Sequence, residues 1–279
     1  MKPAIVDLHW AAPQVMAIVN VTPDSFYAGS RTRTPETIER RILEAVGEGA
    51  TILDVGGYSS RPGAAEVPVE EEWARVKAGV GAARRLAPDA VVSVDTFRSE
   101  VARRVLDEFG PVIINDISAG KLDPQMLDVV ARYGVPYIAM HMKGDPQTMQ
   151  SLTEYRRDIT TEVVFYFRER VERFLAAGIR RERIILDPGF GFAKTVDQNY
   201  ELLSGLHRLC ELGFPVLAGH SRKSMIYKAL DTTPEESLAG TVALGWECLR
   251  QGARILRVHD VREAADTVRL FRIYEQNKH

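Results

Sequence analysis

The stretch Val91-Val-Ser-Val-Asp95 decides the fold class, because it is a short run rich in β-branched residues that ends in a carboxylate. Its largely apolar character is typical of a strand buried on both faces of a parallel sheet. An amphipathic helical pattern over residues 73–87 precedes it. Strands of this kind that alternate with helices predict an α/β architecture.

Runs of the same kind recur along the chain, separated by longer amphipathic stretches. The eight runs cover residues 16–20, 52–55, 91–95, 112–115, 135–141, 183–187, 215–219 and 254–258. The segment 154–177 is predicted to be a long helix with Arg168, Arg170 and Arg173 on a solvated face. Eight strand–helix units predict a single-domain (β/α)8 TIM barrel over residues 1–279, with a doubly wound open sheet as the alternative.

Nearly every apolar run ends in a polar or charged residue. These residues are Asn20, Asp54, Asp95, Asn115, His141, Asp187, Ser221 and the pair Arg257 and His259. A barrel gathers the C-terminal ends of its strands around one mouth, where barrel enzymes hold their substrates. Each residue alone could instead cap the following helix. Together they favour a binding site, because buried carboxylates are costly without partners or ligands.

The polar residues around this predicted mouth are of two chemical kinds. The acceptors suited to a planar heterocycle with several N–H groups are Asp95, Asn115 and Asp187. The donors suited to phosphate are Arg61, Lys223, Arg257 and His259. The stretch Ser221-Arg-Lys-Ser224 follows the seventh run and begins a predicted helix, whose start would favour an anion. We therefore expect a ligand with a nitrogen-rich ring at one end and phosphate at the other.

Two predicted connections between strand and helix have an unusual composition. They cover residues 22–26 and 56–64 and contain glycine and proline. We expect them to be mobile lids that exclude water, whereas the alternative is a pair of ordinary connections. The stretch Asp187-Pro-Gly-Phe-Gly-Phe192 places an aromatic ring beside the mouth, unless Phe192 is a core residue.

The composition excludes several classes of protein. The chain has 279 residues, of which 45% are hydrophobic and 27% charged, and this is typical of a globular domain. A net charge of −2 provides no basic field for nucleic acid or an anionic membrane surface. No apolar run approaches the ~18 residues of a membrane span. Cys210 and Cys248 form no CxxC pattern, which predicts reduced thiols in the cytoplasm.

Taken together, nine segments closely resemble the dihydropteroate synthase family of pterin-binding enzymes. They are Asn20-Val-Thr-Pro-Asp-Ser-Phe26, Asp54-Val-Gly-Gly57, Ser60-Arg-Pro-Gly63, Val94-Asp-Thr96, Asn115-Asp-Ile117, Met140-His-Met142, Asp187-Pro-Gly-Phe-Gly-Phe192, Ser221-Arg-Lys-Ser224 and Arg257-Val-His-Asp-Val261. They occur in family order. One such motif would be weak, but nine in order are highly specific.

The resemblance implies a (β/α)8 enzyme of folate biosynthesis. Its reaction would join 6-hydroxymethyl-7,8-dihydropterin diphosphate to 4-aminobenzoate, giving 7,8-dihydropteroate and diphosphate. The implied mechanism is dissociative, so diphosphate leaves first with the help of Mg²⁺, and the aromatic amine then attacks. Sulfonamides are expected to compete with 4-aminobenzoate, and a homodimer is expected.

The resemblance also implies a role for each matched residue. The implied catalytic residues are Asp95, Asp187, Lys223 and Arg257, and these four bind the pterin together with Asn115. The implied diphosphate contacts are Asn20, Arg61, Arg257 and His259, with Asn20 also the metal contact. The implied walls of the 4-aminobenzoate site are Phe26, Ser60, Pro62, Phe192, Lys223 and Ser224. Asp54 resembles a residue that supports the metal and loop region.

Two other functions remain open on the sequence alone. A pterin-dependent methyltransferase shares the barrel and the pterin pocket, but it needs no diphosphate clamp. A catalytically silent pterin- or diphosphate-binding protein is the other alternative, because Tyr27-Ala-Gly-Ser30 replaces the usual Asp-Gly-Gly-like turn of the family. The helical segment 238–249, which contains Trp246, could supply a dimer interface or simply pack within the barrel.

Overall fold

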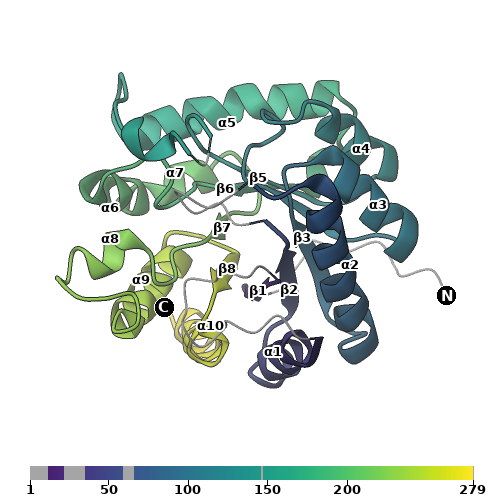
Figure 1. Cartoon of the computed structure of the whole chain (residues 1–279). Coiled ribbons are helices and arrows are strands. Elements are labelled where there is room, and N and C mark those ends of the chain that lie inside the picture. Colours follow the sequence, from purple (N-terminus) through teal and green to yellow (C-terminus); the bar gives the residue numbers. More distant parts are fainter. Residues whose placement is uncertain (1–11, 22–34, 59–65, 146, 279) are drawn as a thin grey trace.

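Eight parallel strands alternate with helices around one axis in the computed structural model (Figure 1). The structure describes residues 12–21, 35–58, 66–145 and 147–278. The strands are β1 (Gln14–Asn20), β2 (Ile52–Gly56), β3 (Val91–Asp95), β4 (Ile113–Asp116), β5 (Tyr137–Met140), β6 (Ile184–Asp187), β7 (Leu217–Ala218) and β8 (Ile255–Val258). The helices are α1 (Pro35–Gly47), α2 (Val69–Leu86), α3 (Ser99–Phe109), α4 (Gln125–Tyr133), α5 (Ile159–Ala176), α6 (Val196–Ser204), α7 (Leu206–Cys210), α8 (Ser224–Tyr227), α9 (Leu238–Arg250) and α10 (Val261–Gln276).

The strands close into a barrel. Neighbours follow the order β6-β5-β4-β3-β2-β1-β8-β7, and every ladder is parallel. A single bridge between Leu186 and Val216 joins β6 to the chain just before β7, where the Leu186 amide donates to the Pro215 carbonyl at 2.9 Å. All eight apolar runs are therefore strands of one barrel, and the open-sheet alternative is wrong.

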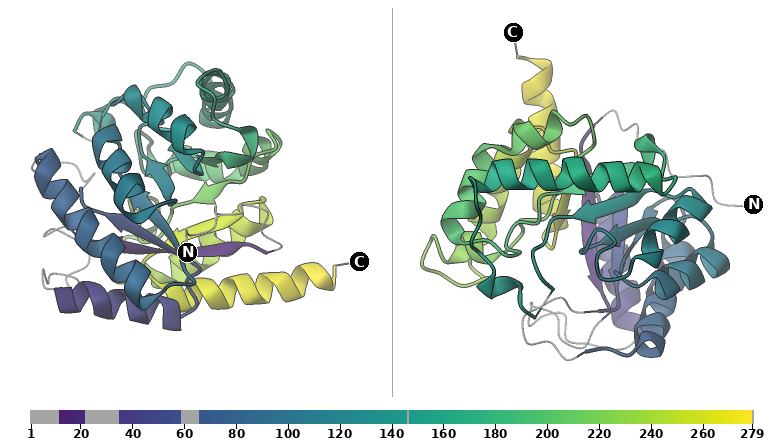
Figure 2. Two further views of the ribbon diagram at one scale, coloured as in Figure 1. Left: turned by 90° about the vertical axis from the view of Figure 1, so that its right-hand side faces the viewer. Right: turned by 90° about the horizontal axis from the view of Figure 1, so that it is seen from above.

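The helices form an outer ring around the sheet (Figures 1 and 2). Outward-facing strand residues such as Leu53 and Ile114 join one core with buried helix residues such as Val76 and Phe167. Burying this apolar surface on both sides of the sheet explains the continuous apolar runs. None of the helices in the described ranges combines the length and apolar character that crossing a bilayer requires.

Helix α5 corrects two expectations. It begins at Ile159, not at residue 154, because the Asp158 side chain accepts a hydrogen bond from the Thr161 amide and caps the helix there. Arg170 is buried, not solvated: it donates to the Ala119 carbonyl, and its guanidinium lies 5.3 Å from the centre of the Phe174 ring. Arg168 and Arg173, on the same helix, are exposed as predicted.

Candidate active site

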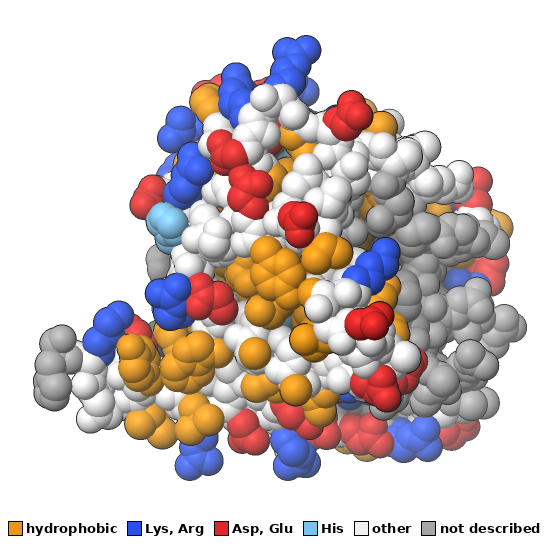
Figure 3. All heavy atoms as spheres, turned by 90° about the vertical axis from the view of Figure 1, so that its left-hand side faces the viewer, with side chains coloured by type: hydrophobic (Ala, Val, Ile, Leu, Met, Phe, Trp, Pro, Cys, Tyr) orange, Lys and Arg blue, Asp and Glu red, His pale blue; other side chains and the backbone are white. Residues whose placement is uncertain are grey.

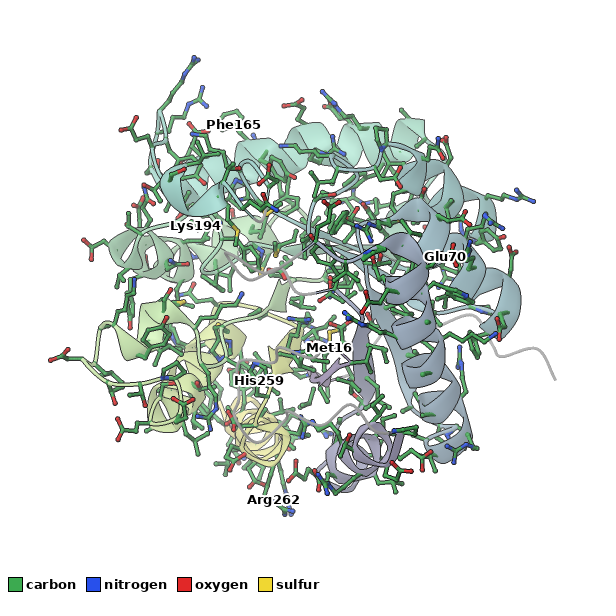
Figure 4. The ribbon with its side chains drawn as sticks, in the orientation of Figure 1. Met16, Glu70, Phe165, Lys194, His259 and Arg262 are labelled. Atoms are coloured by element: carbon green, nitrogen blue, oxygen red, sulfur yellow. The ribbon has the colours of Figure 1, made fainter. Side chains whose placement is uncertain are left out.

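Side chains that point into the barrel form layers, because successive strand residues alternate between inside and outside. One layer is apolar and consists of Met16, Ile52, Ile113, Ile138, Ile185, Leu217 and Ile255. Two residues further along, five strands carry the polar residues Asp54, Ser93, Asn115, Asp187 and Arg257. Figure 4 labels Met16, the member of this layer that lies on β1. Because the polar layer lies nearer the C-terminal ends of the strands, it faces the mouth, and the apolar layer fills the barrel on its other side.

Arg257 of β8 reaches two carboxylates in this mouth. Its Nε donates to Asp54 Oδ2 at 2.6 Å, and its Nη2 donates to Asp95 Oδ2 at 2.7 Å. The fully buried Asp54 also accepts from Ser93 Oγ at 2.6 Å and from Asn115 Nδ2 at 3.1 Å. Asp54 therefore fixes the orientation of both Arg257 and Asn115.

Burial and neighbouring charges shift the pKa values of Asp95 and Arg257. Burial raises the pKa of Asp95 to about 7, against the opposing charge of Arg257, and nearby Asp54 adds to the rise. Burial disfavours the charged form of Arg257, but the two carboxylates outweigh this effect and raise its pKa. Asp95 is therefore poised between its two protonation states near neutral pH, which is typical of functional carboxylates.

Asp187 of β6 and Lys223, before α8, both lie close to Gly219. A Cβ atom at Gly219 would be 3.8 Å from Lys223 Nζ and 3.9 Å from Asp187 Oδ2, so the glycine leaves the space beside them clear. Burial lowers the pKa of Lys223 to about 8 and raises the pKa of Asp187, while the charge of each opposes the shift of the other. The pair offers an acceptor and a donor on one side of the mouth.

The loop after β6 surrounds the Lys223 side chain. Lys223 Nζ donates to the Phe190 carbonyl at 2.6 Å and lies 4.5 Å from the centre of the Phe192 ring. A Cβ atom at Gly191 would be 3.2 Å from Lys223 Cδ, so the lysine stem packs closely against the backbone there. Phe192 is half-buried and lies beside the site, as predicted.

Asn20 ends β1 at the level of Gly56 and Asp95 on the neighbouring strands. A Cβ atom at Gly56 would be 3.7 Å from both Asn20 Oδ1 and Asp95 Oδ2, so the glycine keeps the space beside these oxygens clear. Across the described ranges, no group of three His, Cys, Asp or Glu side chains forms a metal cage. Asn20 is exposed, and its amide oxygen is a ligand type that Mg²⁺ accepts beside waters and substrate phosphates.

His259 follows β8 and lies against the loop after β7; Figure 4 shows it on the α10 side of the barrel. Its amide donates to Ser221 Oγ at 3.2 Å, and its carbonyl accepts from Arg41 Nη2 at 2.8 Å. Burial lowers the pKa of His259 to about 3, and the charge of Arg257 adds to the fall. A neutral imidazole with one N–H beside Arg257 suits an anionic ligand.

The helix predicted to begin at Ser221-Arg-Lys-Ser224 is confirmed but short: helix α8 begins at Ser224 and has only four residues. Anion binding at its start stays a prediction. Arg222 turns away from the mouth and donates from Nε and Nη2 to the Asp260 carboxylate at 2.9 and 2.8 Å. Ser224 is half-buried and immediately follows Lys223.

His141 does not join the mouth. It follows the inward position of Met140, so the alternation turns it outward, where its ring packs against the Tyr166 ring of α5 at a centroid distance of 4.7 Å. The predicted site residues Phe26, Ser60, Arg61 and Pro62 lie outside the described residues, as do residues 22–26 and 59–64 of the predicted lids.

Two contributing positions were not predicted from the sequence. Ser93 holds Asp54, and Gly219 leaves the space beside Asp187 and Lys223 free of a side chain. The period of two could have identified Ser93, which lies two residues before Asp95. Gly219 carries no polar group, so only the three-dimensional arrangement reveals its role.

Comparison with known proteins agrees with this geometry. The sequence matches the family described as pterin binding enzyme over residues 16–259. The crystal structure of *Yersinia pestis* dihydropteroate synthase with a sulfonamide drug complex has a TM-score of 0.91 at 37% identity, over 100% of this chain and 99% of that one. The *Xanthomonas albilineans* enzyme with 4-aminobenzoic acid has a TM-score of 0.85 at 41% identity, over 96% and 95% of the two chains. Fold and site thus define a pterin-binding barrel enzyme.

Sequence relatives identify the family within this class. The *Escherichia coli* (strain K12) dihydropteroate synthase is 44% identical over 264 residues, which cover 94% of this chain and 92% of that protein. The *Haemophilus influenzae* dihydropteroate synthase is 39% identical over 264 residues, covering 95% and 94%. The chain belongs to the dihydropteroate synthase family, whose members are transferases of folate biosynthesis. The synthase interpretation is thereby confirmed over the methyltransferase one.

Proposed function

We propose that the polar layer of the barrel mouth carries out the family reaction. It joins 6-hydroxymethyl-7,8-dihydropterin diphosphate to 4-aminobenzoate and releases diphosphate. The observation that carries this assignment is that Asp95 pairs with Arg257 in the mouth while Asp187 and Lys223 both lie beside Gly219. The whole chain, residues 1–279, acts as one pterin-binding domain in this proposal.

Hydrogen-bond acceptors and donors of the mouth bind the pterin ring. Asp95 and Asp187 accept from ring N–H groups, Asn115 uses its amide, and Lys223 donates to the ring. Hydrogen bonds already hold each acceptor: Arg257 fixes Asp95, and the Gly189 amide donates to Asp187 Oδ1 at 2.8 Å. This order before binding reduces the entropy that binding must overcome.

Diphosphate is held at the other end of the ligand. Arg257 and His259 donate to it, and Arg61 is assigned to the same clamp by its matching motif. Mg²⁺ bound at Asn20 would neutralise charge on the phosphate oxygens. The bond from the pterin methylene to the diphosphate oxygen breaks with its electron pair leaving on the oxygen. Asp95 and Asp187 then stabilise the cation left on the ring.

The 4-aminobenzoate amine attacks this cation without a strong base, because the ammonium product is acidic and loses its proton to water. Phe192, Lys223 and Ser224 form the described walls of this second site. Its remaining walls are assigned to Phe26, Ser60 and Pro62. We expect sulfonamides to compete here, and the *Yersinia pestis* structure with a sulfonamide drug supports that expectation.

Diphosphate release from the pterin diphosphate, with and without 4-aminobenzoate, tests the assignment. We expect Lys223→Met and Asp187→Asn each to lower kcat/KM by about 100-fold or more, because each group stabilises charge in a water-poor site. The matched control is Lys121→Met, whose ammonium lies 4.4 Å from the centre of the Tyr166 ring on the outer helix α5. Wild-type activity in Lys223→Met or Asp187→Asn would reject their roles. If the wild-type chain binds the pterin diphosphate but releases no diphosphate, the protein is instead the catalytically silent binding protein considered above.

We also propose that two copies of the chain form a dimer in the cytoplasm through helices α9 and α10. Trp246 of α9 packs edge-on against Phe271 and Tyr274 of α10, at centroid distances of 5.5 and 5.6 Å. Beside them, Leu270 and Ile273 are 60% and 50% exposed. Apolar side chains gather over this end of α10, at the lower left of Figure 3. An exposed apolar patch of this kind is typical of an interface.

A further inference from the structure

The buried Lys194, which directly precedes helix α6 and its N-cap Thr195, has been assigned no role in the site so far. Its Nζ donates to the carbonyls of Gly189 and Phe192, each at 2.9 Å, and lies 3.0 Å from His141 Nδ1. Burial lowers the pKa of His141 well below its usual value, so the imidazole is neutral and Nδ1 can accept. Burial lowers the pKa of Lys194 to about 7, against the opposing charge of Asp187. In the charged form, the three acceptors satisfy the three N–H groups of its ammonium. Figure 4 shows Lys194 on a side of the barrel away from His259.

The loop that Lys194 binds has an unusual backbone. Gly189, Gly191 and Ala193 have positive φ angles of 67°, 78° and 52°. A Cβ atom at Gly189 would be only 2.1 Å from the His141 carbonyl oxygen, so the loop packs tightly against the end of β5. Left-handed conformations in close succession persist only when the surrounding contacts fix them.

The same loop carries the groups that hold the reactive pair of the mouth. The Gly189 amide donates to Asp187 Oδ1, while the Phe190 carbonyl and the Phe192 ring contact Lys223 Nζ. The two carbonyls bound by Lys194 belong to Gly189 and Phe192, so the ammonium holds both ends of the segment that surrounds Lys223.

We propose that Lys194 is a positioning residue: by holding the Gly189 and Phe192 carbonyls, it keeps Asp187 and Lys223 at the separation that the pterin ring requires and keeps the Phe192 wall in place. The inference rests on the proposed roles of Asp187 and Lys223. Arg257 and His259 lie in other elements, so the diphosphate contacts do not depend on Lys194.

The test compares Lys194→Met, which keeps the side-chain length but removes the donors, with Lys121→Met. We expect Lys194→Met to weaken binding of 6-hydroxymethylpterin and to raise KM for 4-aminobenzoate, each by about tenfold or more. Inorganic diphosphate with Mg²⁺ should bind as in the wild type, measured by calorimetry. Lys194→Gln retains two N–H donors and should show a smaller change in the same direction, which keeps the test decisive if Lys194→Met folds poorly.

Hydrogen exchange of the amides in residues 189–194 provides a measurement independent of activity. It should be faster in Lys194→Met and unchanged in Lys121→Met. A lower melting temperature with unchanged pterin affinity, or exchange that stays slow, would overturn the inference, because Lys194 would then only stabilise the fold. A wild-type chain that does not bind the pterin overturns the proposed function instead, and the exchange difference would still be present.

Discussion

At the scale of single residues, Asp54 determines what Arg257 can do. Asp54 is fully buried, and its carboxylate oxygens accept hydrogen bonds from Arg257, Ser93 and Asn115. Arg257 is thereby fixed before any ligand arrives, and its charge is compensated by Asp54 and Asp95. The energetic cost of burying these charges is met within the protein, so ligand binding does not have to supply it.

Replacing Arg257 should separate its binding role from its structural role. We expect Arg257→Ala to weaken diphosphate binding by roughly 1.5–3 kcal/mol, as for a charged hydrogen bond. It should also lower the free energy of unfolding by about 3–5 kcal/mol, because Asp54 loses its buried partner. Calorimetry with diphosphate and Mg²⁺ measures the first, and urea unfolding measures the second.

Two matched variants complete this experiment. Adding Asp54→Asn to Arg257→Ala should recover stability but not diphosphate affinity, because it removes the unpaired charge without restoring the donor. Arg262→Ala, on the outside of α10, should change neither quantity (Figure 4). Full diphosphate affinity in Arg257→Ala would count against the clamp.

The ionisation of the mouth predicts a narrow pH range for activity. Asp95 accepts hydrogen bonds best when ionised, above its pKa of about 7, and Lys223 donates best when charged, below its pKa of about 8. We therefore expect kcat/KM for the pterin diphosphate to fall below about pH 7 and above about pH 8. Steady-state rates across pH 5.5–9, at about constant ionic strength, measure the profile.

Substitutions assign the two limbs of this profile. Asp95→Asn should remove the acidic limb while lowering the maximum rate. Lys121→Met should leave both limbs in place. A profile that is flat over the whole range contradicts the assignment of Asp95 and Lys223 as the titrating groups.

Whether a side chain lies in the site was predictable where the alternation along a strand places that side chain inside the barrel. Asp95, Asn115 and Asp187 come together for that reason. His141 was misplaced because it stands one residue past the inward position of Met140. Arg170 was misplaced because its charge pattern does not show that the Ala119 carbonyl and the Phe174 ring lie beside it.

At the scale of elements, helix α5 shows how one side chain sets a boundary. The Asp158 carboxylate accepts from the Thr161 amide at 2.8 Å. We expect Asp158→Ala to lower the free energy of unfolding by about 1 kcal/mol, the usual effect of losing an N-cap. Glu154→Ala is the control, because Glu154 is exposed and precedes the helix, and urea unfolding of both variants measures the difference. Equal losses in the two variants would show that the helix extends further back.

The sequence predicted all eight strands but not how short some of them are. The strand at Val91–Asp95 has the predicted bounds, whereas β7 keeps only Leu217 and Ala218 of a predicted five-residue run. Helix α8 likewise has only four residues, Ser224–Tyr227. Apolar composition predicts where a strand lies, but hydrogen bonds to the neighbouring strands determine where it ends, and these depend on closure of the barrel.

At the scale of the whole molecule, the apolar face of α9 and α10 predicts the oligomeric state. We expect the wild-type chain to be a dimer and Leu270→Glu with Ile273→Glu to be a monomer, because two charges would then be buried at the contact. Analytical ultracentrifugation at several concentrations measures this. Leu43→Glu is the control, since Leu43 is 53% exposed on α1. A wild-type chain that remains monomeric rejects the interface.

The single bridge between Leu186 and Val216 makes the junction of β6 and β7 the least connected line in the barrel wall. Asp187 follows directly on one side of that line, and Lys223 follows β7 on the other. If heat or denaturant opens the barrel first between β6 and β7, the Asp187 carboxylate and the Lys223 ammonium move apart while the other strand pairs remain hydrogen-bonded. We then expect the enzyme to lose activity at a lower temperature than the one at which the whole barrel unfolds, because local opening between β6 and β7 precedes global unfolding.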